Sequence, residues 1–392
     1  MKETHTFLVP DYFPRFACKM GDCRAACCQG WPVSVSMENY FRLLGLDCRP
    51  ELRQRLDCGL RPVDRPTQDE YARFNPRYDG DCPVRMADGR CALQAEMGED
   101  VLPDICRLYP RGIRAGAGDG TGGYECSCAS SCEGVIELLF SHPAPLDFIP
   151  HTMTIGIPPL PPRTAHFETL GHAWELRRFF IRLIQNRELP LPGRLVHLGA
   201  NLHAAETALR DRDEAALVRV LAGAVPVPAM PADQLTQAHL ADGLRICEGL
   251  LELLDARSDS IRARGEAALA YFGRDAGVLD RYLTAKADFE HRFPDWPVWF
   301  EHLLVNHMFF AQFPFQDRPE SIGDEYVALC AVYALLRFLA LGTRPADQTA
   351  FVDTAAALFR LIDHTSFDRY AAHLLKRVGC GTPEALADLI SL

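Results

Sequence analysis

Three features are scarce in this 392-residue sequence: histidine in its first third, an apolar run at its start, and an excess of basic residues. His5 is the only histidine before His142, so a metal site in that region would have to be built without imidazole. Residues 1–16 carry charge and proline where a secretory signal has an apolar run, which predicts a cytoplasmic protein with reduced thiols. The net charge of −11 disfavours nucleic acid or an anionic membrane as the main partner.

Alternating β-branched segments are also nearly absent after about residue 167, where leucine and alanine recur at helical spacing, as from Ala173 to Ile184. The nearly apolar run from Tyr326 to Leu341 is short for a membrane span and contains Arg337, which predicts a buried helix. Helices are expected near residues 37–46 (with Ser36 as N-cap), 132–140, 195–223, 233–256, 259–273, 276–291, 296–311, 322–341, 346–363 and 383–391.

These patterns predict a mainly α protein with a loop-rich cysteine-cluster module at its N-terminus and an all-α C-terminal domain. We expect the module at 1–142, a proline-rich connector at 143–166 and the helical domain at 167–392. Because the module has many chain breakers and few apolar faces, its compactness is expected to depend partly on metal bonds.

Cysteine is abundant, and it is concentrated at one end of the chain. Twelve of the 15 cysteines lie in the first 132 residues, beginning with the pattern C-x4-C-x3-C-C from Cys18 to Cys28. In a reducing compartment such crowding favours metal binding over disulfides. Without histidine, the remaining choices are a four-cysteine zinc site or an iron–sulfur cluster. The spacing matches neither a CxxC…CxxC zinc ribbon nor CxxxCxxC, and it leaves both metals open.

The cysteine motifs resemble those of a known family. ACKMGDCRAACCQGW at 17–31, CPVRMADGRCAL at 82–93, DICRLYPRG at 104–112 and SSCEGVIELLF at 130–140 are similar to the flagellin lysine-N-methylase (FliB) family. The middle motifs also resemble a broader group of zinc- or iron-chelating cysteine-cluster proteins. In the C-terminal half, AWELRRFFIRLIQNR (173–187) and LLVNHMFFAQFPF (303–315) resemble the methylases, so the resemblance covers most of the chain.

This resemblance implies transfer of a methyl group from S-adenosyl-L-methionine to lysines of flagellin or a flagellin-like protein, by an enzyme with a [4Fe-4S] cluster. It gives eight metal-ligand candidates: Cys18, Cys23, Cys27, Cys28, Cys82, Cys91, Cys106 and Cys132. One cluster takes at most four protein sulfurs, so eight candidates imply two metal sites, or one site with additional thiols around it. Cys126 and Cys128 fall outside the family pattern, and Cys48 and Cys58 are expected to be free thiols.

Residues beside Cys106 suggest further roles. Arg107 and Arg111 could bind the carboxylate of S-adenosyl-L-methionine, or they could neutralise a negatively charged thiolate cluster. Tyr109 is the candidate catalytic residue, because a lysine methyltransferase has to deprotonate its target amine.

Two other signals have simpler structural readings. The glycine-rich run 116–123 does not lie between a strand and a helix, so we interpret it as a turn, and the sequence shows no Rossmann-type cofactor motif. Asn306 and His307 lie in an apolar helix, where they either orient a substrate amine or are satisfied core residues. Two alternatives to a methyltransferase stay open: a zinc-stapled binding module, and an iron–sulfur redox protein.

Overall fold

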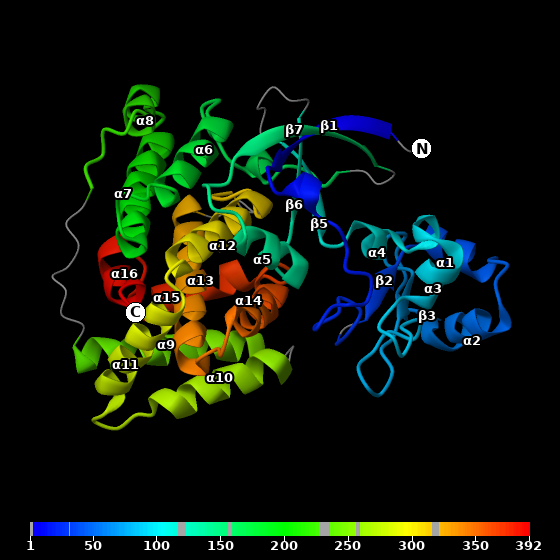
Figure 1. Cartoon of the computed structure of the whole chain (residues 1–392). Helices are drawn as coiled ribbons and strands as arrows, with labels where there is room; N and C mark the ends of the chain where they lie inside the picture. The colour runs from blue at the N-terminus through cyan, green and yellow to red at the C-terminus, as the bar shows by residue number, and fades with distance from the viewer. Residues whose placement is uncertain are drawn as a thin grey trace. The chain divides into compact units, whose positions relative to one another are not determined.

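The computed structural model describes residues 3–30, 32–116, 123–155, 159–227, 236–255, 259–315 and 321–392 (Figure 1). By its internal contacts the chain divides into two compact units. The larger, which we call the helical unit, comprises Met1–Pro14, Ile113–Ser131 and Val135–Leu392. The smaller, the cysteine unit, comprises Arg15–Gly112 and Cys132–Gly134.

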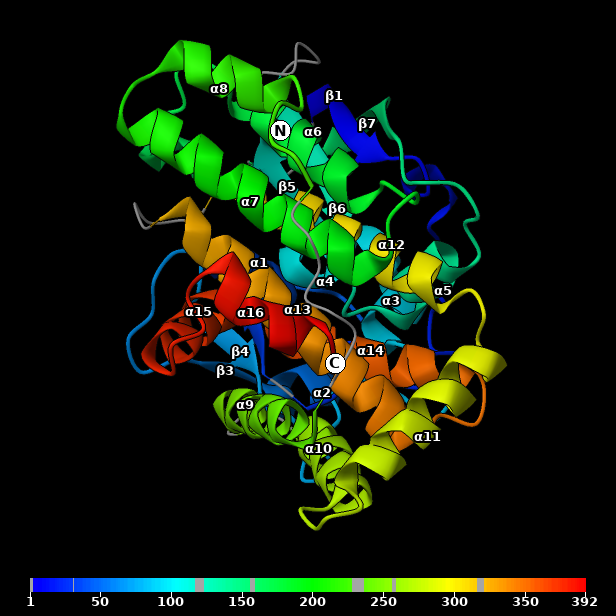
Figure 2. The same cartoon turned by 90° about the vertical axis from the view of Figure 1, so that its left-hand side faces the viewer.

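The helical unit is built around one long buried helix, α13 (Ile322–Thr343). In the described part of the chain, eleven helices follow residue 167: α6 (Ala173–Ile184), α7 (Leu191–Arg210), α8 (Glu214–Leu221), α9 (Gln237–Asp255), α10 (Asp259–Phe272), α11 (Val278–Arg292), α12 (Trp296–Phe310), α13, α14 (Gln348–Ile362), α15 (Phe367–Arg377) and α16 (Pro383–Ile390). Helices α7, α9, α14 and α16 pack against α13 (Figure 2). Among the described residues, α13 is also the one helix long and apolar enough to cross a membrane, but 94% of its apolar window is buried inside the protein. The prediction of a buried core helix is thus confirmed.

Most of the predicted helices are present, and the mainly α fold class is confirmed. Thr382 caps α16 by accepting a hydrogen bond from the Ala385 amide, with Pro383 in the first turn. The segment 195–223, expected as one helix, is two, because Arg212 between α7 and α8 has a positive φ of 53°. Helix α15 was not predicted. Its buried face is small, with Phe367, Ala371, Ala372 and Leu375 set among charged residues.

A four-stranded sheet in the helical unit was also not predicted. Its order is β5 (Arg111–Ala115), β6 (Tyr124–Cys128), β1 (Glu3–Pro10) and β7 (Phe148–Ile155). Strand β1 runs parallel to β6 and pairs antiparallel with β7 along all eight of its residues, from Glu3↔Ile155 to Pro10↔Phe148. The proline-rich segment 143–166 thus contains a strand of this sheet. The domain boundaries expected at 142 and 166 stay predictions, since a contact-based division does not test which segments fold independently.

The cysteine unit has an apolar core of its own. Its sheet has the order β2 (Val33–Val35), β4 (Ala72–Phe74), β3 (Leu60–Pro62), and its helices are α1 (Met37–Leu44), α2 (Pro50–Gly59), α3 (Ala92–Met97) and α4 (Asp104–Leu108). The Ser36 hydroxyl caps α1 by accepting from the Asn39 amide, as predicted. The core side chains are Val33, Val35, Leu43, Leu52, Leu56, Leu60, Ala72, Phe74, Cys82, Val84, Leu93 and Leu102. The expectation of few apolar faces is therefore wrong for this unit.

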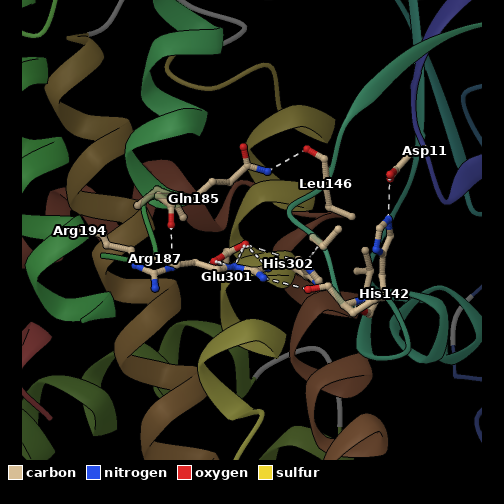
Figure 3. A network of polar contacts seen from close by, with 12 residues as sticks. Asp11, His142, Leu146, Gln185, Arg187, Arg194, Glu301 and His302 are labelled. Atoms are coloured by element: carbon tan, nitrogen blue, oxygen red, sulfur yellow. Dashed lines mark hydrogen bonds and ion pairs between the residues drawn. The ribbon is translucent and has the colours of Figure 1, made fainter. Parts of the chain in front are cut away.

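The helix α5 (Glu133–Phe140) leads into a turn that buried polar groups hold in place (Figure 3). His302 on α12 is fully buried, with Nδ1 2.8 Å from the Leu139 carbonyl oxygen and Nε2 2.9 Å from that of Ala144. Gln185 donates to the Leu146 carbonyl at 2.8 Å, and His142 in the turn itself contacts Asp11 at 2.8 Å. Several elements thus converge on one short segment.

A fully buried carboxylate, Glu301, lies next to His302 on α12. It accepts hydrogen bonds from Arg187 at 2.8 and 2.9 Å and from Arg194 at 2.7 Å (Figure 3). Arg187 also donates to the Pro143 carbonyl oxygen at 2.9 Å, so the ion pair contacts the same turn after α5. A buried charge is stable only when it is paired and hydrogen-bonded, and Glu301 meets both conditions.

Candidate functional site

The eight ligand candidates all belong to the cysteine unit, although they come from four separate stretches of the chain. They are Cys18, Cys23, Cys27, Cys28, Cys82, Cys91, Cys106 and Cys132. Cys126 and Cys128, which lie outside the family pattern, are instead buried in β6 of the helical unit. All 15 cysteines lie among the described residues, and none of them is in a disulfide.

Backbone pairing brings the first group of thiols together. The Cys82 amide donates to the Cys28 carbonyl at 2.9 Å, beside a bridge between Gln29 and Asp81. A second bridge joins Arg85 to Cys91, which is also the N-cap residue of α3. We call Cys27, Cys28, Cys82, Cys91 and Cys106 the five-thiol group, because each interacts electrostatically with at least one other member. Cys27 also interacts with Cys18, which lies outside this group.

Within this group, Cys27 and Cys28 have opposite acidities. The Cys27 thiol donates a hydrogen bond to Cys28, which raises the pKa of Cys27 and lowers that of Cys28 to about 7. The positive charge of Arg85 further lowers the pKa of Cys28. Cys28 is therefore the member of the pair that ionises near neutral pH, as a metal ligand or a nucleophile must.

The other three members of the five-thiol group resist ionisation. Burial raises the pKa of Cys82 to about 12 and also raises the pKa values of Cys91 and Cys106. The nearby Cys28 and Cys91 oppose a further negative charge on Cys106, whose thiol is desolvated although the residue as a whole is exposed. These three groups are therefore neutral thiols, and a bound cation would be needed to favour their thiolate forms.

The three remaining candidates, Cys18, Cys23 and Cys132, include one thiol, Cys23, that interacts with the buried carboxylate of Glu133. Glu133 has a side chain only 2% exposed, and it accepts hydrogen bonds from the Lys19 ammonium at 3.0 Å and from the Arg24 and Ala25 amides at 3.2 and 3.0 Å. Burial acts to raise its pKa, but these donors outweigh burial and lower it. Burial and the Glu133 charge raise the pKa of Cys23, which also interacts with Cys18. Glu133 thus fixes the loop that carries the first cysteines.

Sequence reasoning missed Glu133. The available signal was its position, directly after Cys132 and in the first turn of α5, where a carboxylate is favoured. Nothing in the sequence indicated that the loop 19–25 would fold back onto it.

The donor chemistry of these two groups fits a thiophilic metal, since sulfur is the ligand type that zinc and iron–sulfur clusters take. Among the residues that the structure describes, however, no three cysteine, histidine, aspartate or glutamate side chains are close enough to hold a metal ion together. The eight thiols therefore share one compact unit without forming a coordination sphere in it.

The arginines and the tyrosine beside Cys106 have partners of their own. Arg107 donates to Asp104 at 2.7 Å within α4, and the Arg111 guanidinium lies 5.2 Å from the centre of the Phe16 ring. Tyr109 is half-buried and ends α4. Their roles in binding S-adenosyl-L-methionine and in catalysis stay predictions. Of the glycine run, residues 117–122 lie outside the described part of the chain.

Asn306 in α12 is a core amide. It accepts a hydrogen bond from the Tyr12 hydroxyl at 2.6 Å and donates to the Cys128 carbonyl and the Ser130 hydroxyl, both at 2.9 Å. These three contacts support the structural reading of Asn306. The neighbouring His307 contacts Asp363 at 3.0 Å.

Comparison with protein-family models found one match. The model for the FliB lysine N-methylase C-terminal domain matches residues 177–389, which is more than half of the chain. Neither the curated proteins nor the solved structures gave a significant match.

Proposed function

The chain belongs to the FliB lysine N-methylase family, and on this premise we propose that it is a protein-lysine N-methyltransferase that methylates flagellin in the cytoplasm. The observation that carries the proposal is the match of the family's C-terminal domain to residues 177–389. That range covers helices α7 to α15 completely, together with most of α6 and α16.

We further propose that S-adenosyl-L-methionine is the methyl donor, since its sulfonium group supplies an activated methyl. The chain itself must then bind flagellin, place a lysine side chain and remove the ammonium proton before the nitrogen can act as a nucleophile. The described residues include no strand–glycine–helix phosphate loop, so we assign no pocket to the donor.

The metal centre that we propose is a [4Fe-4S] cluster in the cysteine unit. Its ligands would come from the five-thiol group, where Cys28 is already the most readily ionised member. Cys18, Cys23 and Cys132 would then form a second site or surround the first. Zinc is the alternative metal, because it takes the same thiolate donors.

Two measurements test this proposal in sequence. The purified protein should be brown and contain iron and sulfide, and it should transfer labelled methyl groups from S-adenosyl-L-methionine to flagellin lysines. A colourless protein with bound zinc and full transferase activity would overturn the cluster but keep the enzyme. An iron–sulfur protein that leaves flagellin unmethylated would instead be a redox protein.

A further inference from the structure

Three side chains of the helical unit form an acid–base chain to which the proposed function has so far given no role. His307 of α12 lies between two carboxylates: its Nδ1 is 3.0 Å from Asp363 Oδ1, and its Nε2 is 3.8 Å from Asp368 Oδ1. Asp363 directly follows α14, and Asp368 lies in the first turn of α15. Three separate helices thus bring the groups together.

This chain runs from the surface toward the interior. The side chain of Asp368 is 18% exposed, whereas those of His307 and Asp363 are 7% and 1% exposed. Asp368 Oδ1 is buried and has no hydrogen-bond partner among the described residues. A buried carboxylate oxygen without a donor is costly in a folded protein and is concentrated at functional sites.

The surrounding charges make Asp368 a stronger base than an ordinary aspartate. Burial raises its pKa, and the nearby Asp363 raises it further, against the opposing positive charges of His307 and Arg163. Burial acts to lower the pKa of His307, but Asp363, Asp368 and Glu325 outweigh it and raise that pKa. A raised carboxylate pKa is what a general base needs near neutral pH.

Resting on the proposed function, we propose that Asp368 binds the ε-ammonium group of the substrate lysine and removes its proton, while His307 and Asp363 hold Asp368 in place. In this step an N–H bond of the ammonium breaks and an O–H bond forms on Asp368. The products are a neutral amine, whose lone pair is available for methylation, and a neutral carboxylic acid. The Asp368 side chain, which is 18% exposed, then returns the proton to solvent.

The known acidities show why such a site is needed. In water the proton transfer from a lysine ammonium to an aspartate is unfavourable by about six pKa units. Burial raises the pKa of the carboxyl group and lowers that of an amine bound beside it, so both shifts narrow this gap. An exposed carboxylate would provide neither shift.

The test is the rate of flagellin methylation by the full-length protein between pH 6 and 10. For Asp368→Asn we expect a rate about 100-fold below wild type near pH 7, which is the loss typical of a missing general base. The deficit should shrink toward pH 10, where lysine loses its proton without help. Asp324→Asn is the matched control: Asp324 is also 18% exposed in the first turn of its helix, but it pairs with Lys376.

A second variant separates catalysis from folding. Removing the His307 charge in His307→Gln should raise the pKa of Asp368 and move the acid limb of the pH–rate profile to higher pH. If Asp368→Asn and Asp324→Asn have equal rates, or if the acid limb of His307→Gln does not move, Asp368 is not the base. If the wild-type protein leaves flagellin unmethylated, the proposed function fails, and the role of Asp368 fails with it.

Discussion

Glu133 shows how much of the cysteine unit depends on a single side chain. Its carboxylate, flanked by Cys132, is the acceptor for two backbone amides and one ammonium group from the loop 19–25. The candidate metal ligands could be predicted from the sequence, because the cysteine motifs are short patterns of neighbouring residues. The role of Glu133 could not be predicted from the sequence, because its hydrogen-bond partners lie more than 100 residues away and only the folded chain brings them together.

Glu133→Gln should therefore destabilise the cysteine unit by about 2 kcal/mol, since hydrogen bonds to a charged group contribute about 1.5–3 kcal/mol each and glutamine keeps one acceptor oxygen. The pKa of Glu133 is lowered by folding, so its contribution should be present at neutral pH and lost as the pH falls through the folded-state pKa. Urea unfolding at pH 7 measures the change. Glu51→Gln, at an exposed site on α2, is the control and should have little effect.

The metal content of cysteine variants should depend on which thiols are ligands. Cys106→Ala should lower the bound metal of the purified protein, because Cys106 interacts with all four other members of the five-thiol group. Cys58→Ala should leave the metal content unchanged, since Cys58 is also an exposed residue but lies outside the family pattern. Equal metal content in the two variants would remove Cys106 from the ligand set.

Among the elements, α12 combines two histidines of opposite character on one helix. Burial lowers the pKa of His302, while the carboxylates around His307 raise the pKa of that residue. The spacing of apolar residues predicted α12, as the range 296–311. It could not distinguish the two histidines, because their partners come from the turn after α5 and from the ends of α14 and α15.

The two histidines should affect stability with opposite dependence on pH. The neutral form of His302 is favoured by folding, so its contribution is present above about pH 6.5 and is lost as the pH falls below that unfolded-state value. His307 is favoured in its charged form, so its contribution is present below about pH 6.5 and is lost as the pH rises through its folded-state pKa.

Melting curves of His302→Gln and His307→Gln between pH 5 and 8 measure this difference. The stability deficit of His302→Gln relative to wild type should be larger at pH 8 than at pH 5, and that of His307→Gln larger at pH 5 than at pH 8. If the stability deficits of the two variants changed with pH in the same direction, or did not change between pH 5 and 8, the opposite pKa shifts of His302 and His307 would be contradicted.

For the whole molecule, local sequence patterns predicted most of the helices and the mainly α fold class. They did not predict which segments of the chain belong to each of the two units. Most of the helices predicted from α6 onward are present, because each helix buries the apolar face that its own residues form. The sheet was missed because β1 pairs with β7, about 145 residues later, and such a pairing leaves no local pattern to read. The prolines at 143–166 also argued against a regular element, although Pro150 lies within β7, opposite Leu8.

Each unit has its own apolar core, so removal of the metal that we propose should affect the stability of the cysteine unit alone. A strong chelator is expected to lower the melting temperature of the cysteine unit, because a structural metal contributes folding free energy directly. The helical signal in circular dichroism should melt at an unchanged temperature. A shift of both transitions together would show that the two units unfold as one cooperative body.

The pairing of β1 with β7 also bears on how the protein is made. Strand β1 leaves the ribosome long before its antiparallel partner β7 has been translated, because Glu3 pairs with Ile155. At about 5–20 residues per second this interval lasts on the order of 10–30 seconds, during which the apolar segment Phe7–Val9 lacks its antiparallel partner. Nascent chains should therefore depend on holdase chaperones until residue 155 emerges.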